Sequence, residues 1–212
     1  MKPVILIPAF KPDKSVLENL VKAVLALDVA QVLVVDDGSG PSYESAFSAV
    51  RHLDRTVVLT HPESRGKGEA LRTGFRHVIN FRTACSGVIT MDADGQHLVR
   101  DVESVMQVFS KNPDCLVLGV RNFKGQVPLR SLVGNRLTRF LFQGLAGRRI
   151  SDTQTGLRAH PRRLLDRMLA FKSGRYAYEL EALLSLVHQK VPVKEVPITT
   201  VYEDNNAVSS FK

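Results

Sequence analysis

The sequence predicts an α/β fold: a mostly parallel sheet flanked by helices on both faces. Short, continuously apolar runs alternate along the chain with segments whose apolar residues recur at helical spacing. Several of these runs end abruptly in carboxylates, as strands do where a parallel sheet presents its ligand sites. The 212 residues are 44% hydrophobic, which fits one domain whose core needs no disulfides.

The first part of the chain contains the clearest alternation. Residues 4–7 predict a buried strand closed by Pro8, and residues 16–25 predict an amphipathic helix. The same two patterns then predict strands at 32–35, 56–59, 88–91 and 116–120, and helices at 43–50, 70–79 and 98–110. Because parallel strands end at one edge of a sheet, the residues that follow them should gather there.

The second part of the chain has a different character. An apolar stripe over 132–145 is accompanied by arginines, which predicts an amphipathic helix. Such a helix either lies at a membrane interface or packs on its own core. Further along, the patterns predict a polar turn, two helices and an edge strand that contains two prolines, at 151–158, 162–171, 177–189 and 191–201.

Composition and charge narrow the classes of partner and location. The net charge of +8 favours acidic partners such as nucleotides, lipid phosphates or anionic membranes. Only 7% of residues are aromatic and none is Trp, so we expect no nucleic-acid partner. Cys85 and Cys115 match neither a disulfide framework nor a zinc site. Apolar runs are too short for a membrane span or a signal peptide, so we expect a cytoplasmic protein, either free or peripheral on the inner face of the cell membrane.

A candidate metal site follows the fourth predicted strand. Asp92 and Asp94 stand two residues apart on a turn and can converge on one hard cation, which the Gln96 amide oxygen can join. In the alternative interpretation, Asp94 only caps the helix that begins near Leu98. His97 is expected to be a turn residue beside the metal, because oxygen ligands suffice for Mg²⁺.

A candidate anion site belongs to the same edge of the sheet. Asp36 and Asp37 end the second strand and can accept hydrogen bonds from a base N–H or a ribose hydroxyl. Lys67 offers a point charge for phosphate oxygens, and Gly66 and Gly68 let the backbone come close, although such a segment is also an ordinary turn. Neither a Walker loop nor a dinucleotide fingerprint is present. These groups suit a ligand that carries both a diphosphate and hydroxyls.

The motifs, taken in order, resemble those of glycosyltransferase family 2. The resemblance is carried by Val-Ile-Leu-Ile-Pro-Ala-Phe, Val-Leu-Val-Val-Asp-Asp-Gly-Ser, Arg-Gly-Lys-Gly-Glu-Ala-Leu-Arg-Thr-Gly-Phe and Met-Asp-Ala-Asp-Gly-Gln-His, at 4–10, 32–39, 65–75 and 91–97. Later segments are similar to the dolichyl-phosphate-mannose-synthase-like, polyprenyl-phosphate branch: Leu-Gly-Val-Arg, Ser-Asp-Thr-Gln-Thr-Gly-Leu-Arg and Val-Pro-Ile-Thr-Thr-Val-Tyr, at 118–121, 151–158 and 196–202.

The resemblance implies a GT-A fold with a Rossmann-like sheet, in one domain over 1–212. Residues 1–122 would form the nucleotide-sugar-binding half and 123–212 the acceptor half. The implied reaction moves a sugar, with inversion, from a UDP- or GDP-sugar to a polyprenyl phosphate. The alternative acceptor is a hydroxyl of a polysaccharide or glycolipid. Since the branch often carries transmembrane helices after this domain, we expect either a longer native chain or a peripheral enzyme that meets its acceptor at the membrane.

The family pattern also implies roles for individual residues. Nucleotide-sugar binding would fall to Pro8, Ala9, Phe10, Asp36, Asp37, Lys67, Asp92, Arg121 and Arg130. Mg²⁺ or Mn²⁺ would be held by Asp92, Asp94 and Gln96. The catalytic candidates are Asp94, through the metal, and Asp152, which lies near the acceptor. The family usually has Tyr-Asn where this chain has Phe10-Lys11, which leaves the choice between uracil and guanine open.

The chemistry of glycosyl transfer agrees with these roles. A nucleoside diphosphate leaves a carbon that becomes oxocarbenium-like, and a metal with nearby cations neutralises the developing charge. A phosphate acceptor is already ionised and needs no general base, whereas a hydroxyl acceptor needs one, for which Asp152 is the first candidate. The alternative role of Asp152 is to cap its turn. A sugar-phosphate nucleotidyltransferase is disfavoured because the loop after the first strand, residues 8–12, is not glycine-rich.

Overall fold

The structure is a computed structural model, and it describes residues 1–80, 84–121, 144, 147, 149–171, 173 and 177–199. Its strands are β1 (Val4–Ala9), β2 (Gln31–Asp36), β3 (Thr56–Thr60), β4 (Gly87–Thr90), β5 (Leu116–Arg121), β6 (Arg158–Pro161) and β7 (Val193–Ile198). Its helices are α1 (Lys14–Leu25), α2 (Glu44–Arg51), α3 (Lys67–Asn80), α4 (Val99–Lys111), α6 (Leu165–Ala170) and α7 (Ala177–His188), with short 3₁₀ turns η1 (Pro41–Tyr43) and η2 (Arg162–Leu164).

The strands form one seven-stranded sheet in the order β3-β2-β1-β4-β6-β5-β7. All neighbouring pairs are parallel except those that β6 makes with β4 and β5. The predicted, mostly parallel sheet is therefore confirmed. The chain passes from β1 to β2 on one side, whereas β4 pairs with β1 on the other. A change of direction of this kind opens a crevice beyond the carboxyl ends of the strands.

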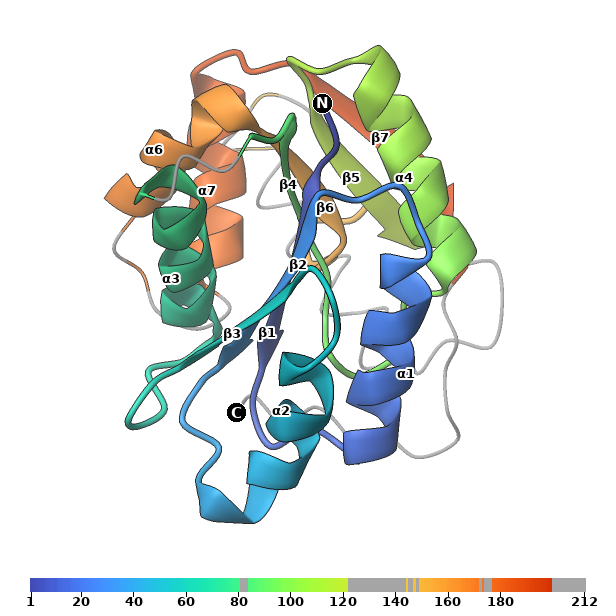
Figure 1. Ribbon diagram of the computed structural model, residues 1–212. Helices are drawn as coiled ribbons and strands as arrows, with labels where there is room; N and C mark the ends of the chain where they lie inside the picture. Colours follow the sequence, from blue (N-terminus) through green and yellow to red (C-terminus); the bar gives the residue numbers. More distant parts are fainter. Residues whose placement is uncertain are drawn as a thin grey trace.

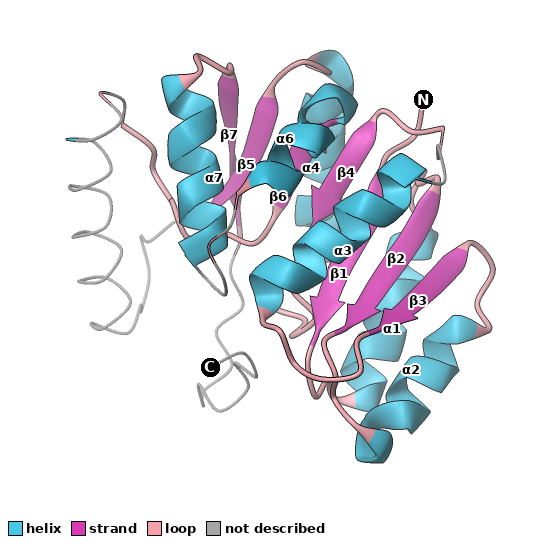
Figure 2. Ribbon diagram, turned by 90° about the vertical axis from the view of Figure 1, so that its left-hand side faces the viewer, coloured by secondary structure: helices cyan, strands magenta, loops and turns pink. Residues whose placement is uncertain are grey.

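Helices cover both faces of the sheet, as predicted. Figure 1 shows α3, α6 and α7 on one side and α1, α2 and α4 on the other, and Figure 2 shows the first of these layers in front of the strands. Successive residues of β1 point to opposite faces, so Leu6 packs in the core with Phe75 of α3, while Ile5 packs with Leu17 of α1. Helix α1 begins where the Asp13 carboxylate accepts a hydrogen bond from Val16 N, at 2.9 Å.

Two local predictions differ from the structure. Strand β6 was not predicted, because its residues Arg-Ala-His-Pro lack an apolar run, although all four are buried. Lys67, which the sequence placed in a loop, is the first residue of α3.

The predicted edge strand is confirmed as β7, at the end of the sheet beside β5. The predicted helix over 132–145 and the site residue Arg130 lie outside the described residues.

None of the helices within the described ranges is both long and apolar enough to cross a bilayer.

A buried histidine in β6 predicts a pH-dependent stability. The His160 side chain packs edge-on against Phe75 with ring centroids 5.3 Å apart, and burial, followed by the charge of Arg158, lowers its pKa to about 3. Below about pH 6.5 the His160 imidazole is protonated in the unfolded chain but stays neutral in the folded chain. The folded state therefore loses stability as the pH falls from 6.5 towards 3. At about pH 5 the expected loss from this residue is about 2 kcal/mol.

Urea unfolding at about pH 6.5 and at about pH 5 measures this effect. His160→Phe keeps a ring against Phe75 and has no titrating group, so its free energy of unfolding should fall less between the two pH values. Equal falls in the variant and the original chain would contradict the assignment.

Candidate active site

The predicted site residues meet at one edge of the sheet. Strands β1, β2, β4 and β5 all end there, and antiparallel β6 begins there, since Arg158 pairs with Thr90 of β4 and Leu118 of β5. The expectation that the acidic residues after β2 and β4 share an edge with Lys67 is thus met. Pro8 and Ala9 close β1 at the same edge, where Ala9 pairs with Asp36.

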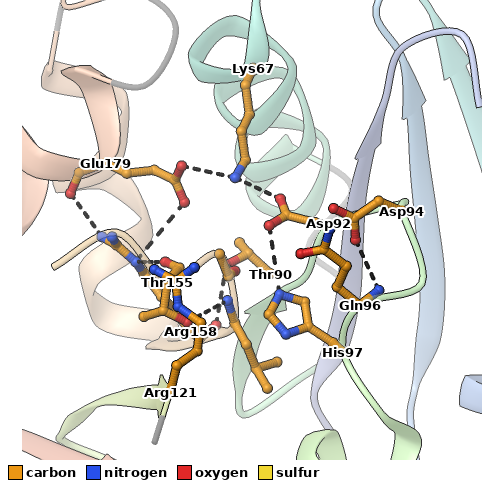
Figure 3. Close-up of polar contacts among 12 residues, drawn as sticks. Lys67, Thr90, Asp92, Asp94, Gln96, His97, Arg121, Thr155, Arg158 and Glu179 are labelled. Atoms are coloured by element: carbon orange, nitrogen blue, oxygen red, sulfur yellow. Dashed lines mark hydrogen bonds and ion pairs between the residues drawn. The ribbon is translucent and has the colours of Figure 1, made fainter. Parts of the chain in front are cut away.

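Lys67 lies between two carboxylates at the centre of this edge. Its Nζ is 2.6 Å from Asp92 Oδ1 and 2.9 Å from Glu179 Oε2, and its side chain is only 6% exposed. Figure 3 shows the lysine extending from α3 between Glu179 and the turn after β4. Burial opposes its charge, but the charges of Asp92 and Glu179 prevail and raise its pKa. Lys67 therefore keeps its positive charge in the folded chain.

The two aspartates of the turn after β4 differ in their surroundings. Burial opposes ionisation of Asp92, yet the charge of Lys67, assisted by His97, lowers its pKa. Burial, and then the charge of Asp92, raises the pKa of Asp94. His97 Nε2 is 3.6 Å from Asp92 Oδ2. Close carboxylates that repel each other form an oxygen donor set in which a divalent cation relieves the repulsion.

Other contacts of the turn agree with a metal-binding role. Helix α4 begins after Leu98, without a side-chain cap, so the alternative in which Asp94 caps this helix is wrong. Asp94 instead accepts a hydrogen bond from Gln96 N, at 3.0 Å, and the Gln96 side chain lies beside both carboxylates (Figure 3). The described residues contain no group of three or more His, Cys, Asp and Glu side chains that could hold a metal. A cation here would therefore need further ligands, such as the Gln96 oxygen or phosphates of a donor.

Gly156 gives Asp92 the space that it occupies. The Gly156 carbonyl accepts a hydrogen bond from Thr90 Oγ1, at 2.9 Å, which fixes the loop before β6 against β4. A Cβ added at Gly156 would lie 2.3 Å from Asp92 Oδ2. A side chain at this position must therefore push the Asp92 carboxylate away.

Gly156→Ala is expected to lower kcat about 100-fold, which is the order of effect that a displacement of about 1 Å has in an active site. Steady-state kinetics measure the change, and circular dichroism checks that the variant is folded. Gly144→Ala is the control, because an added Cβ there meets no described atom within 4 Å. Unchanged kinetics of the Gly156 variant would show that the position of Asp92 does not matter.

Asp37 organises the loop ahead of Lys67. Its fully buried carboxylate accepts hydrogen bonds from Arg65 N, Gly66 N, Ser64 Oγ and the His61 ring, at 2.8–2.9 Å. Those contacts are all within the chain, so in the structure Asp37 shapes the loop that leads into α3.

Asp36 supports the loop after β1. Its carboxylate accepts a hydrogen bond from Ser39 N, at 2.9 Å, and Ser39 Oγ accepts one from Lys11 N, at 2.8 Å. The Lys11 ammonium lies over the Phe10 ring, 5.1 Å from its centroid. The residues that depart from the family pattern, Phe10 and Lys11, are therefore tied to the end of β2.

Asp152, which is fully buried, and Arg121, which is partly exposed, form a bidentate pair. Arg121 Nε and Nη2 donate to the two Asp152 oxygens at 2.6 and 3.0 Å, and the Asp152 side chain is 0% exposed. Gln154 N donates to the same carboxylate at 3.0 Å. Because both oxygens are engaged, proton transfer to Asp152 would first require this charge-assisted pair to open.

Two residues of the site were not predicted from the sequence. Arg158 is 2% exposed and donates to the carbonyls of Thr155, Glu179 and Thr153 at 2.8, 2.8 and 3.0 Å. Glu179 holds Lys67. A signal for Glu179 was available, because it is a charged residue within the apolar stripe of α7, one turn before Ala182. Buried acids are rare unless they are paired.

Comparison with known proteins relates this chain to a known family. The model for "Glycosyl transferase family 2" matches residues 4–171. A UDP-N-acetylglucosamine–dolichyl-phosphate N-acetylglucosaminyltransferase of Methanococcus voltae is 28% identical over 94% of this chain and 86% of its own length. A polyprenol monophosphomannose synthase of Mycolicibacterium smegmatis is 30% identical over 79% of this chain and 65% of its own.

Solved structures show the same fold. Glucosyl-3-phosphoglycerate synthase from Mycobacterium tuberculosis, in complex with Mn²⁺, UDP and phosphoglyceric acid, superposes with a TM-score of 0.70 at 17% identity. The match covers 96% of this chain and 72% of that protein. The predicted GT-A-type architecture is therefore confirmed.

Proposed function

Because the chain belongs to glycosyl transferase family 2, and is thus an enzyme of the glycosyltransferase class, we propose that it transfers a sugar from a UDP- or GDP-sugar to a polyprenyl phosphate. Relatives named for dolichyl-phosphate and polyprenol-phosphate acceptors support the choice of acceptor. A lipid acceptor also implies a peripheral contact of this chain with a membrane.

The observation that carries this proposal is the bidentate pairing of the buried Asp152 carboxylate with Arg121. A hydroxyl acceptor needs a general base, and the acid best placed by sequence, Asp152, has both oxygens bound within the chain. A lipid phosphate is ionised already and needs a cation instead of a base. The family pattern implies that Arg121 and Arg130 bind the nucleotide-sugar. In this proposal Arg121 instead faces the acceptor phosphate, with its guanidinium oriented by Asp152, and Arg130 is proposed to bind phosphate of the donor.

On the donor side, Pro8, Ala9, Phe10 and Asp36 are proposed to line the nucleotide pocket. Asp37 acts there through the Ser64–Gly66 loop. Asp92, Asp94 and Gln96 are proposed to hold Mg²⁺ or Mn²⁺, which when bound supplies electrostatic stabilisation of the leaving diphosphate. Lys67 adds a permanent positive charge beside that group, and electrostatic stabilisation of this kind is usually the largest single contribution to catalysis.

The acceptor proposal is tested with paired lipids. The purified protein is incubated with Mn²⁺, with UDP-glucose, UDP-N-acetylglucosamine or GDP-mannose, and with either a polyprenyl phosphate or the polyprenol of equal length. We expect glycosylation of the phosphate alone. Comparable transfer to the polyprenol would favour the hydroxyl-acceptor alternative.

Asp152→Asn distinguishes orientation of Arg121 from base catalysis. The amide keeps one acceptor oxygen for Arg121 but loses the charge, so we expect the KM for the lipid phosphate to rise about tenfold, the size of one weakened charged hydrogen bond. The pH profile of kcat should keep its shape, and the loss should not add to that of Arg121→Met. A collapse of kcat without a change of KM would identify Asp152 as a base instead.

A further inference from the structure

The charged side chains around Lys67 alternate in sign. Arg158, Glu179, Lys67 and Asp92 follow one another, with 4.0 Å between Arg158 Nε and Glu179 Oε1 and the two short lysine contacts beyond (Figure 3). The series joins α7 and β6, late in the chain, to the turn after β4. One end of it is a proposed metal ligand.

Lys67 and a divalent cation compete for the same carboxylate. An ammonium 2.6 Å from Asp92 Oδ1 occupies a direction from which that oxygen would coordinate a metal. The two cations also repel each other at such short range. A metal therefore binds well only if the ammonium has another anion to move to, and Glu179 is the other carboxylate to which the structure pairs it.

Glu179 is suited to receive the ammonium. Its side chain is 9% exposed, so water screens its charge weakly. Its Oε1 is a buried oxygen with no hydrogen-bond partner among the described residues, and it can therefore accept a bond from Lys67. The backbone carbonyl of Glu179 is held by Arg158 Nη1 at 2.8 Å, which fixes the start of α7.

We propose that Glu179 is a positioning residue that draws Lys67 away from Asp92 and so opens the Asp92–Asp94 pair to a divalent cation. This inference rests on the proposed metal-dependent function. It predicts that neighbouring residues of opposite charge have opposite effects on metal affinity. Loss of Glu179 leaves the Lys67 ammonium paired with Asp92 and lowers the affinity for the metal, whereas loss of Lys67 raises that affinity.

The test measures Mn²⁺ binding by electron paramagnetic resonance of the free ion, first without substrates and then with UDP, where a protein-free sample of Mn²⁺ and UDP gives the baseline. Glu179→Gln should raise the Mn²⁺ dissociation constant about tenfold, within the range for neighbours in one ion-pair network. Glu181→Gln is the matched control, because it removes the same charge from the same helix, where Glu181 accepts a hydrogen bond from Ser173 N at 3.1 Å. Its dissociation constant should stay unchanged, and equal weakening in both variants would overturn the inference.

A double-mutant cycle separates competition from direct attraction between Glu179 and the metal. Lys67→Met should bind Mn²⁺ more tightly than the original chain, and adding Glu179→Gln to it should change little. If adding Glu179→Gln to Lys67→Met lowers the Mn²⁺ affinity by the full tenfold, Glu179 attracts the cation directly, and this result would overturn the inference. If Lys67→Met fails to fold by circular dichroism, the comparison of Glu179→Gln with Glu181→Gln decides alone.

The outcomes distinguish this inference from the proposed function. An original chain that binds Mn²⁺ neither alone nor together with UDP contradicts the metal-dependent function, and the inference falls with it. If the original chain binds Mn²⁺ and Glu179→Gln binds it equally tightly, the inference is contradicted but the proposed function is not.

Discussion

Asp94→Asn is expected to lower kcat about 100- to 1000-fold, the effect of removing about 3–4 kcal/mol of transition-state stabilisation. Asp92 shares its charge with Lys67, so Asp94 supplies much of the remaining negative charge of the proposed metal site. Burial, and then the charge of Asp92, raises the pKa of Asp94, so the surroundings of this carboxylate disfavour its negative charge. The neutral amide is a far weaker ligand for Mg²⁺ or Mn²⁺.

Kinetics at several Mn²⁺ concentrations, together with urea unfolding, measure this prediction. The variant should be at least as stable as the original chain without metal, because the substitution removes the repulsion from Asp92. Asp114→Asn is the control, since Asp114 is an exposed acid that is paired with Arg163 and precedes the start of β5, whereas the proposed site lies where β5 ends. Near-normal turnover of Asp94→Asn would exclude a catalytic metal at this turn.

Arg158→Met is expected to destabilise the fold by about 3–5 kcal/mol, the effect of removing one partner from a buried ionic network. The substitution removes the hydrogen bonds that the guanidinium donates to the carbonyls of Thr153, Thr155 and Glu179. It also removes the positive charge beside the Glu179 carboxylate. Methionine fills a similar volume, so the loss reports polar contacts rather than a cavity.

Urea unfolding measures the loss, and Arg158→Lys is the matched variant. Lysine keeps the charge but cannot reproduce the planar fork that reaches three carbonyls, so we expect an intermediate stability. If Arg158→Met is as stable as the original chain, the guanidinium does not hold the loop before β6.

The sequence predicted most of the sheet because most strands are apolar runs that end in polar motifs. It did not predict β6, whose Arg158 and His160 are buried polar residues that only the completed sheet accommodates. A run without apolar periodicity carries no local signal for a strand. The antiparallel direction of β6 depends on the topology of the sheet, and this direction brings Arg158 to the edge at which β4 ends.

The site residues that directly follow strand ends could be predicted from the sequence. The prediction was incomplete for residues that join the site through contacts between distant parts of the chain. Asp92 and Asp94 are near each other in sequence, so their convergence could be predicted. The pairing of Lys67 with Glu179 joins helices more than 100 residues apart, which no local pattern encodes. The enclosure of Asp37 and Asp152 also depends on backbone groups of loops that meet only in the folded chain.

The most direct measurement of the central claim is a crystal structure of the protein with UDP and Mn²⁺, with data collected at the manganese absorption edge. We expect an anomalous peak within coordinating distance of Asp92 and Asp94, about 2.0–2.4 Å from their oxygens, with the diphosphate on its other side. UDP bound at this edge of the sheet with no anomalous peak beside Asp94 would contradict a metal-dependent transfer.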